Sequence, residues 1–400
     1  ESVDNAPYGF NSGLIYKTLY PKGHPYSWTV IGEMEDLANA TVEDVKAFHG
    51  KFYIPNNATL VVSGDYDPET IKPMIEKYFG EIPAGEQLAD PQPMNITLNE
   101  TKKLFHEDSF ANAPQYNMVF PTNEQFTKDA YSLDVLAQLL GQGKKSPLYK
   151  VLVKDKKLTS SVRSDNSAME LTGRFQITVT ANPMTSLDSV EQAIFEAFSK
   201  FEAEGFTAND LERIKARLET NFYNTISSIM YKSYMLAYYN EMAGSPDYLV
   251  RELDLMKSVT AEDVWDVYNR YINGKNYLAT SFVPKGQVAL VASGSVNAGI
   301  VEEDITKATQ VEVVAAKEEE IAQIQDRMLR LAAEMENTRK RLEREKADGI
   351  AFANECLIRE LLPAIDNLER AVSHGAGEDE ASTLIEGVRM TLKGFLDALA

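Results

Sequence analysis

The pattern of hydrophobic and polar positions divides the chain near residue 316. Before about residue 286, apolar positions switch between helical spacing and short strand-like runs, which is typical of an α+β fold. A buried strand is predicted over 58–63, and a hairpin over 160–166 and 170–181, where Phe175, Ile177 and Val179 alternate with polar residues. Helices are predicted over about 68–78, 123–140, 186–204 and 208–243.

A gapless internal repeat organises this first part. The segment 41–52, Thr-Val-Glu-Asp-Val-Lys-Ala-Phe-His-Gly-Lys-Phe, aligns with 260–271, Thr-Ala-Glu-Asp-Val-Trp-Asp-Val-Tyr-Asn-Arg-Tyr, at an offset of 219 residues. Each begins like a capped helix and leads through an asparagine-containing turn into an apolar run, 58–63 or 277–283. Agreement over the helix, the turn and the following strand indicates duplication of a domain.

After residue 316 the pattern is purely helical. Six apolar residues predict a coiled-coil seam: Ile321, Ile324, Met328, Leu331, Met335 and Leu342. Together with Thr338, they are spaced by 3, 4, 3, 4, 3 and 4 residues. Because such a seam needs a partner helix, it favours a homodimer. A second amphipathic helix from about 382 to the end predicts a helical hairpin suited to a bundle. The range 286–316, which contains Ser293-Gly294-Ser295, is predicted to be a linker.

Length and charge narrow the classes of protein. With 400 residues and 44% hydrophobic composition, two to three globular domains are expected. The 40 basic residues against 60 acidic ones give a net charge of −20, which argues against nucleic acid and anionic membranes as partners. The charge-free run 286–301 is 16 residues, too short and too polar to span a bilayer. The chain begins with Glu1 and stops inside an apolar-periodic stretch, so it is expected to be a window of something longer.

Candidate chemistry is sparse. The single cysteine, Cys356, excludes an intrachain disulfide and is interpreted as a buried thiol. His106-Glu107-Asp108 is the only local cluster of metal-ligand types, and we interpret it as a solvated polar stretch. The run 141–146 resembles a phosphate loop, but Gln138 replaces the first glycine and a helix precedes it. From the residues alone we therefore assign no catalytic residue and no metal ligand.

Several strings in residues 1 to about 310 resemble the insulinase/pitrilysin family of zinc metallopeptidases. They include Asp4-Asn-Ala-Pro-Tyr-Gly9, Tyr20-Pro-Lys-Gly-His-Pro-Tyr26, Tyr53-Ile-Pro-Asn-Asn-Ala58 and Lys77-Tyr-Phe-Gly-Glu-Ile-Pro83. The resemblance implies two homologous α+β domains, in agreement with the repeat. That family's chemistry requires an H-x-x-E-H zinc motif and a further glutamate ligand. Neither is present, so zinc is implied only for the complete family member, and this chain is expected to be inactive alone.

Residues 317–400 resemble the GrpE family of nucleotide exchange factors for DnaK chaperones. The matching strings are Ala333-Glu-Met-Glu-Asn-Thr-Arg-Lys-Arg341, Leu361-Leu-Pro-Ala-Ile-Asp-Asn-Leu-Glu-Arg-Ala371 and Glu386-Gly-Val-Arg-Met-Thr-Leu-Lys393. The resemblance implies a parallel dimer of long helices, a DnaK partner and a cytoplasmic location. The family's C-terminal β-domain is expected to begin after residue 400.

Together these patterns predict an α+β protein with an all-α extension. Residues 1–97 are expected to be the C-terminal part of a catalytic-type peptidase domain, truncated and for that reason poorly folded, and 98–285 the second, non-catalytic domain. The linker 286–316 and the coiled coil and helical bundle segment 317–400 follow. Three interpretations stay open: two protein fragments joined by an assembly or gene-model error, a pseudopeptidase that lines a peptide chamber and pairs with an active subunit, and a chaperone-cofactor scaffold.

Overall fold

The computed structural model describes residues 6–30, 32, 34–302 and 388–393. It divides into two compact units, residues 1–302 and 303–400, and the first carries almost all of the described residues. The short segment 388–393 in the second unit is helical. All six predicted seam residues, from Ile321 to Leu342, and Cys356 lie outside the described residues.

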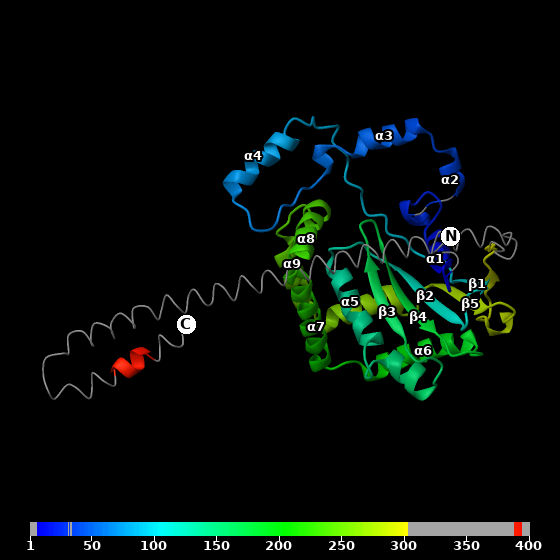
Figure 1. Cartoon of the computed structure of the whole chain (residues 1–400). Helices are drawn as coiled ribbons and strands as arrows, with labels where there is room; N and C mark the ends of the chain where they lie inside the picture. The colour runs from blue at the N-terminus through cyan, green and yellow to red at the C-terminus, as the bar shows by residue number, and fades with distance from the viewer. Residues whose placement is uncertain (1–5, 31, 33, 303–387, 394–400) are drawn as a thin grey trace, which may run out of the picture. The chain divides into compact units, whose positions relative to one another are not determined.

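A six-stranded mixed sheet forms the centre of the first unit (Figure 1). The strand order is β3-β4-β2-β5-β1-β6. Strand β1 pairs in parallel with β5 and β6, whereas β2 pairs antiparallel with β4 and β5, and β3 pairs antiparallel with β4. The strands are β1 (Lys102–Asp108), β2 (Gln115–Thr122), β3 (Arg163–Ala168), β4 (Gly173–Thr180), β5 (Leu278–Pro284) and β6 (Val296–Asn297). The β3–β4 pair confirms the predicted hairpin.

Helices cover one face of this sheet and enclose the main core. Alternate residues of β4, Phe175, Ile177 and Val179, are fully buried against them, as the strand period requires. Long apolar stripes on α5 and α6 fill the facing layer. The covering elements are α5 (Lys128–Gly141), η3 (Tyr149–Asp155), α6 (Leu187–Glu204), α7 (Ala208–Ser227), α8 (Ile229–Met242), α9 (Tyr248–Ser258), α10 (Ala261–Val267) and η4 (Tyr268–Ile272). The predicted helix 208–243 is broken at Ser228, whose hydroxyl accepts from the backbone of Tyr231 as the cap of α8.

The opposite face is covered only in part, by the helix α1 (Asn11–Leu19). Ile15 and Leu19 of α1 pack on Val119 of β2 and Leu278 of β5 in a second, smaller apolar cluster. The half of this face that belongs to β3 and β4 carries no buried side chain directed outward. One half of the sheet is therefore sandwiched and the other half open.

The predicted solvated stretch at His106 is buried, which corrects the sequence interpretation. His106 is 4% exposed and Asp108 is 1% exposed. His106 packs edge-on against Phe282, and its Nε2 lies 2.8 Å from Oε1 of Glu302. The polar pattern of 106–108 suggested solvent, but β1 lies between β5 and β6, and both neighbours and α1 enclose it.

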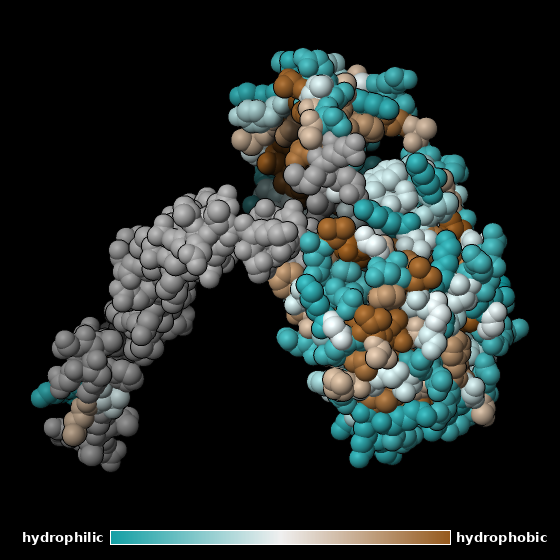
Figure 2. All heavy atoms as spheres, turned by 90° about the vertical axis from the view of Figure 1, so that its right-hand side faces the viewer, coloured by the Kyte–Doolittle hydropathy of each residue, from teal (hydrophilic) through white to brown (hydrophobic). Residues whose placement is uncertain are grey.

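Residues 25–105 contribute no buried side chain to the described structure. The elements in this range are η1 (Pro25–Ser27), α2 (Met34–Asn39), α3 (Val42–Phe52), η2 (Pro55–Asn57), α4 (Pro68–Phe79) and the start of β1. Val45 and Phe48 of α3 and Tyr78 of α4 are more than half exposed. The upper part of Figure 2 correspondingly shows hydrophobic surface beside hydrophilic surface. Exposed apolar side chains at this density are unusual for a folded monomer.

The predicted buried strand at 58–63 is wrong. These residues are irregular and none is buried. Their repeat counterpart became β5, which has hydrogen-bonded neighbours on both sides. A β-branched run forms a strand only when a neighbour accepts and donates its backbone hydrogen bonds, and the described residues supply none for 58–63.

The repeated helices begin as predicted. Thr41 and Thr260 each accept from the backbone of the third helical residue, Asp44 or Asp263, and that aspartate accepts from the backbone of the threonine in return. Such a box satisfies two backbone donors at a helix start. His49 of α3 is exposed, whereas Tyr268, at the same position of the second repeat, is buried.

The first unit continues past residue 286. The turn η5 (Val288–Leu290) and β6 belong to it, Ala292 is buried, and Glu302 contacts His106. The unit boundary after Glu302 falls inside the predicted linker range of 286–316. No helix among the described residues is long and apolar enough to cross a membrane.

Candidate functional site

The open half of the sheet carries a group of polar strand residues, of which Arg163 is exposed and the others are partly exposed. On β4 the side chains that face the helices, Phe175, Ile177 and Val179, are apolar, whereas Arg174, Gln176 and Thr178 face outward. Strand β3 is polar on both faces: its Ser164 and Asn166 bond to α5. The register pairs Arg163 with Thr178 and Asp165 with Gln176, which places all four on one face. We call this surface the open sheet face; its residues are Arg163, Asp165, Ser167, Arg174, Gln176 and Thr178.

A buried amide, Asn117, links the open sheet face to the covered half. Its Oδ1 accepts from Gln176 Nε2 at 3.1 Å and from Thr178 Oγ1 at 2.9 Å. Its Nδ2 donates to Thr280 Oγ1 at 3.2 Å, and Thr280 donates to Asn11 of α1. Asn117 is fully buried and uses both its oxygen and its nitrogen, so it fixes the rotamers of the half-exposed Gln176 and Thr178.

Strand β3 is one edge of the sheet. Among the described strands it pairs only with β4, so the other side of its backbone is open. Arg163 Nε lies 3.0 Å from Asp165 Oδ1 in an exposed ion pair on this strand. An open edge is a template on which an extended peptide can add as a further strand.

Arg174 lies at one end of the open sheet face, opposite Pro121 of β2. Its guanidinium carbon lies 4.8 Å from the centre of the Tyr16 ring. Its Nε and Nη1 and the hydroxyl of Tyr20 are buried and have no hydrogen-bond partner among the described residues. Burial raises the pKa of Tyr20 to about 12, and the charge of Arg174 opposes that rise. Since no carboxylate in the described part of the chain pairs with Arg174, this end of the face is positive.

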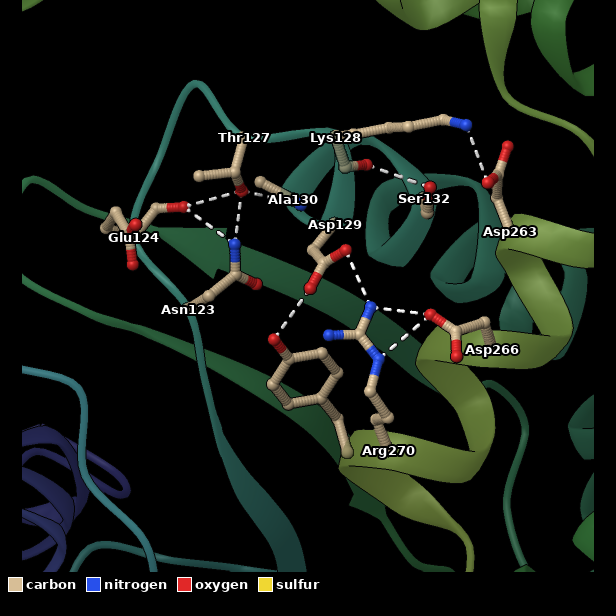
Figure 3. A network of polar contacts seen from close by, with 11 residues as sticks. Asn123, Glu124, Thr127, Lys128, Asp129, Ala130, Ser132, Asp263, Asp266 and Arg270 are labelled. Carbon is tan, nitrogen blue, oxygen red and sulfur yellow. Dashed lines mark hydrogen bonds and ion pairs between the residues drawn. The ribbon is translucent and has the colours of Figure 1, made fainter.

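A second polar network joins the start of α5 to η4 (Figure 3). Asp129 accepts from Arg270 Nη2 at 2.7 Å and from the Tyr271 hydroxyl at 2.8 Å. Asp266 accepts from Arg270 Nη2 at 2.6 Å and Nε at 2.9 Å. Hydrogen bonds to Asp129 and Asp266 hold the pKa of Arg270 above its usual range, so the guanidinium stays charged.

Asn123 belongs to the same network. Its Nδ2 donates to the carbonyl of Glu124 at 3.0 Å and also contacts Thr127 Oγ1, which caps α5. Gly173 permits this arrangement, because a Cβ there would lie 2.4 Å from the carbonyl oxygen of Asn123. Asn123 is 7% exposed, yet its Oδ1 has no hydrogen-bond partner within the part of the chain that the structure describes.

Two carboxyl groups lie inside the helical layer. Asp134 accepts from Asn166 Nδ2 at 3.1 Å. Glu252 accepts from the hydroxyls of Tyr131 and Tyr239. Burial raises the pKa of Asp134 to about 7; the Asn166 hydrogen bond opposes this and the charge of Glu252 adds to it. Burial likewise raises the pKa of Glu252. Carboxyl groups with raised pKa values occur at functional sites, but these two hold helices together and adjoin no described cavity.

We expect Asp134→Asn to stabilise the protein at pH 8 and to leave it nearly unchanged at pH 4. An unfolded Asp ionises near pH 4 and the folded one near pH 7, so wild-type stability falls as pH rises between these values. Removing the charge should recover on the order of 2 kcal/mol at pH 8, measured by urea unfolding. Asp188→Asn is the control of opposite sign, because hydrogen bonds from Ser293 lower the pKa of Asp188. Equal stability of wild type and Asp134→Asn at pH 8 would contradict the assignment.

The described histidines do not fit a zinc ion. Both ring nitrogens of His24 are engaged, Nδ1 by the backbone N–H of Tyr26 and Nε2 with the carbonyl of Met94. His106 contacts Glu302, and His49 stacks on Tyr53. Within the described part of the chain, no group of three or more His, Cys, Asp or Glu side chains is placed to hold a metal. We therefore assign no zinc ligand among these side chains.

The sequence predicts no catalytic or metal residue, and the six predicted seam residues lie outside the described residues. Asn117, Asn123 and Arg174 were not predicted. The alternation of polar residues with apolar ones over 115–122 and 173–180 is the signal that could have found Asn117 and Arg174. No local sequence pattern distinguishes Asn123. Its notable feature, a side-chain oxygen without a described partner, can be recognised only in the folded structure.

Comparison with known families assigns both parts of the chain. Residues 39–218 match the family described as "Peptidase M16 inactive domain", and residues 298–400 match the family described as "GrpE". Two regions of one polypeptide thus match two different families, which confirms both resemblances.

Curated relatives support the same division. The chain is 29% identical over 278 residues to the zinc protease PqqE of Helicobacter pylori, a match that covers 67% of this chain and 61% of that protein. It is 65% identical over 89 residues to protein GrpE of Syntrophobacter fumaroxidans, covering 22% of this chain and 47% of that protein. The chain thus spans about half the length of that GrpE and less than two thirds of the zinc protease.

Solved structures agree on the fold of the first unit. A protease from Helicobacter pylori superposes with a TM-score of 0.61 at 25% identity, covering 70% of this chain and 68% of that one. A peptidase M16 inactive domain from Pseudomonas fluorescens gives 0.59 at 21% identity, covering 74% and 68%. The first unit thus has an M16-type α+β fold.

Proposed function

We propose that the first unit is a non-catalytic peptide-binding scaffold, the wall of a peptide chamber, whose parent activity is proteolysis. The observation that carries this proposal is the open sheet face beside the unpaired edge of β3. Backbone groups on the edge offer hydrogen bonds to any extended chain, and the fixed amide and hydroxyl of Gln176 and Thr178 add side-chain contacts. A pseudopeptidase that pairs with an active zinc peptidase subunit would use this face to hold substrate.

The domain limits are part of the proposal. We assign 1–97 to the remnant of a catalytic-type domain and 98–285 to the non-catalytic domain, followed by a linker within 286–316. The absence of buried side chains over 25–105 supports a remnant that has no core of its own. The sheet and its helices, in contrast, form a continuous core that lies mostly within the second range and extends to Ala292.

We expect extended peptides to bind this scaffold without zinc. The probe is an N-terminally fluorescein-labelled, unstructured peptide with an amidated C-terminus, titrated with the chain in EDTA and followed by fluorescence anisotropy. The double variant Arg163→Ala/Asp165→Ala changes the β3 edge at little cost in stability, since an exposed ion pair contributes under about 1 kcal/mol. It should weaken binding about fivefold.

The matched control removes an exposed ion pair from the helical layer, Lys156→Ala/Glu196→Ala, and should leave affinity unchanged. An absence of saturable binding to every peptide tested would refute the scaffold proposal. Equal weakening by both double variants would refute the location on β3.

A second function, chaperone cofactor, is favoured by the 65% identity of 89 residues to a GrpE. We propose that residues 317–400 form a homodimer through a coiled coil whose seam is Ile321, Ile324, Met328, Leu331, Met335 and Leu342, with DnaK as partner and the cytoplasm as location. Sedimentation of the full chain should give a dimer, and Leu331→Asp should give a monomer, because a charge in a seam opposes association. A monomeric wild-type chain would refute the seam. A transcript that does not span codons 286–320 would instead favour two fragments joined by error.

A further inference from the structure

The segment 293–302 closes the first unit at the edge of the sheet opposite β3. Its strand β6 pairs with β1 at two positions, Leu104 and Phe105. One further backbone hydrogen bond, of 2.8 Å, runs from the N–H of Ala298 to the carbonyl of Phe105. Because β1 has seven residues, backbone pairing with this segment covers less than half of its outer edge.

Apolar burial contributes little to holding this segment, which we call the strap. Ala292, directly before it, is 1% exposed, but none of residues 293–302 is buried. Val296 is 65% exposed and Val301 is 86% exposed. The hydroxyl oxygen of Ser295 is buried without a hydrogen-bond partner among the described residues, and release of the strap would return it to water. The strap is therefore held by polar contacts and not by a core.

Two carboxylates fasten the strap, one at each end. At its start, Asp188 of α6 accepts from the backbone N–H of Ser293 at 2.6 Å and from the Ser293 hydroxyl at 2.7 Å. At its end, Glu302 Oε1 accepts from the backbone N–H of Ser109 at 3.1 Å and lies 2.8 Å from His106 Nε2. Hydrogen bonds to a charged acceptor are roughly twice as strong as those between neutral groups. The attachment of the strap thus depends chiefly on Asp188 and Glu302.

The strap can leave the sheet without moving another strand. Among the described strands, β6 pairs with β1 alone, so its release leaves the other pairings intact. Glu302 is the last residue of the first unit, and Gly294 near the start of the strap has a φ of +79°, which glycine adopts without strain. Segments with few buried contacts open locally at a free energy far below that of global unfolding.

We propose that residues 293–302 are a detachable strap that blocks the outer edge of β1, and that this edge binds an extended peptide when the strap is released. A bare β1 offers seven residues, enough for an added strand of about five or six. The sheet then has two receptive edges, β3 at all times and β1 on release. The inference rests on the proposed peptide-binding function and adds its regulation.

Hydrogen exchange of the full chain, followed by mass spectrometry of a peptic fragment that contains Ala298, measures the release. The amide of Ala298 should exchange at least tenfold faster in Asp188→Ala/Glu302→Ala than in the wild type, because both fastenings are lost. Glu302→Ala alone should give about a threefold increase. Amides of the core strand β2 are the internal reference and should exchange equally in all variants.

Asp210→Ala is the matched control. Like Asp188, Asp210 lies in the first turn of a long helix and accepts from one backbone N–H and one hydroxyl, both of Thr207. Its replacement should leave the exchange of the strap unchanged. Thermal unfolding of each variant is measured alongside, and Glu302→Ala, which changes no helix, decides the case if the double variant unfolds.

A peptide titration tests the uncovered edge. The labelled, amidated peptide that probes the scaffold should bind at one site per chain in the wild type and at two in Asp188→Ala/Glu302→Ala, measured by anisotropy well above Kd. Adding Arg163→Ala/Asp165→Ala to that variant should weaken one site and leave the other unchanged.

Equal exchange of Ala298 in the wild type and in both strap variants would overturn the inference. Faster exchange with one peptide per chain would overturn β1 as a binding edge, and so would two sites that both weaken when β3 is changed. If the wild-type chain binds no peptide, the scaffold proposal fails, whereas the exchange rates still decide whether the strap detaches.

Discussion

Replacing Glu191 by alanine should lower the free energy of unfolding by about 3–5 kcal/mol, the range seen when one partner of a buried ion pair is removed. Glu191 of α6 is 8% exposed. Its Oε1 accepts from the hydroxyls of Tyr116 at 2.6 Å and Tyr277 at 2.7 Å, and its Oε2 lies 2.6 Å from Lys103 Nζ. One carboxylate thereby ties strands β1 and β2 and the residue before β5 to the helical layer. Its loss leaves an ammonium and two hydroxyls without an acceptor.

Two further variants separate this effect from the loss of packing. Glu191→Gln keeps an acceptor for the tyrosines and loses the charge that pairs with Lys103, so it should cost about half as much. Glu196→Ala on the same helix removes an exposed partner of Lys156 and should cost less than about 0.5 kcal/mol. Urea unfolding followed by circular dichroism gives all three values. A cost below 1 kcal/mol for Glu191→Ala would contradict its role as the tie between the layers.

The repeat provides the second large effect. Val45 and Val264 occupy the same position of the repeated helix, yet Val45 is 63% exposed and Val264 is fully buried. Val264→Ala should cost about 2 kcal/mol, from lost apolar burial and the cavity left behind. Val45→Ala should cost less than about 0.5 kcal/mol.

Val45→Ala serves as the control for Val264→Ala, because the substitution, the helix start and the capping box are the same at both sites. Both variants are measured by urea unfolding, and the slope with denaturant is compared to exclude a change in the unfolded state. An equal loss for both would mean that α3 is buried in solution, by contacts that the described residues do not supply.

Local pattern predicted the elements whose neighbours are also close in sequence. The alternation of Phe175, Ile177 and Val179 predicted β4, and its partner β3 follows directly from the hairpin. Helix starts at Thr41 and Thr260 were predictable because a cap is formed within four residues. Both family resemblances depended on strings of this kind.

Pattern failed where the outcome depends on distant parts of the chain. The runs 58–63 and 277–283 are both apolar, but only the second lies between two hydrogen-bonded strands. His106 is polar in the sequence, but Phe282 and Glu302 enclose it in the fold, and its contact with Glu302 spans 196 residues. The candidate site has the same origin: Asn117 bonds Thr280 across 163 residues, and Asn123 is notable only for a missing partner.

The open edge of β3 has a consequence for the handling of the protein. An exposed strand edge is where identical chains join into aggregates, most readily when its side chains are large and apolar. The strand reads Arg-Ser-Asp-Asn-Ser-Ala, with no large apolar residue and with neighbouring charges of opposite sign. Such an edge disfavours pairing between identical chains, so we expect the protein to stay in solution at high concentration. Under the proposed function, the same six residues stay available to a peptide that supplies its own apolar side chains.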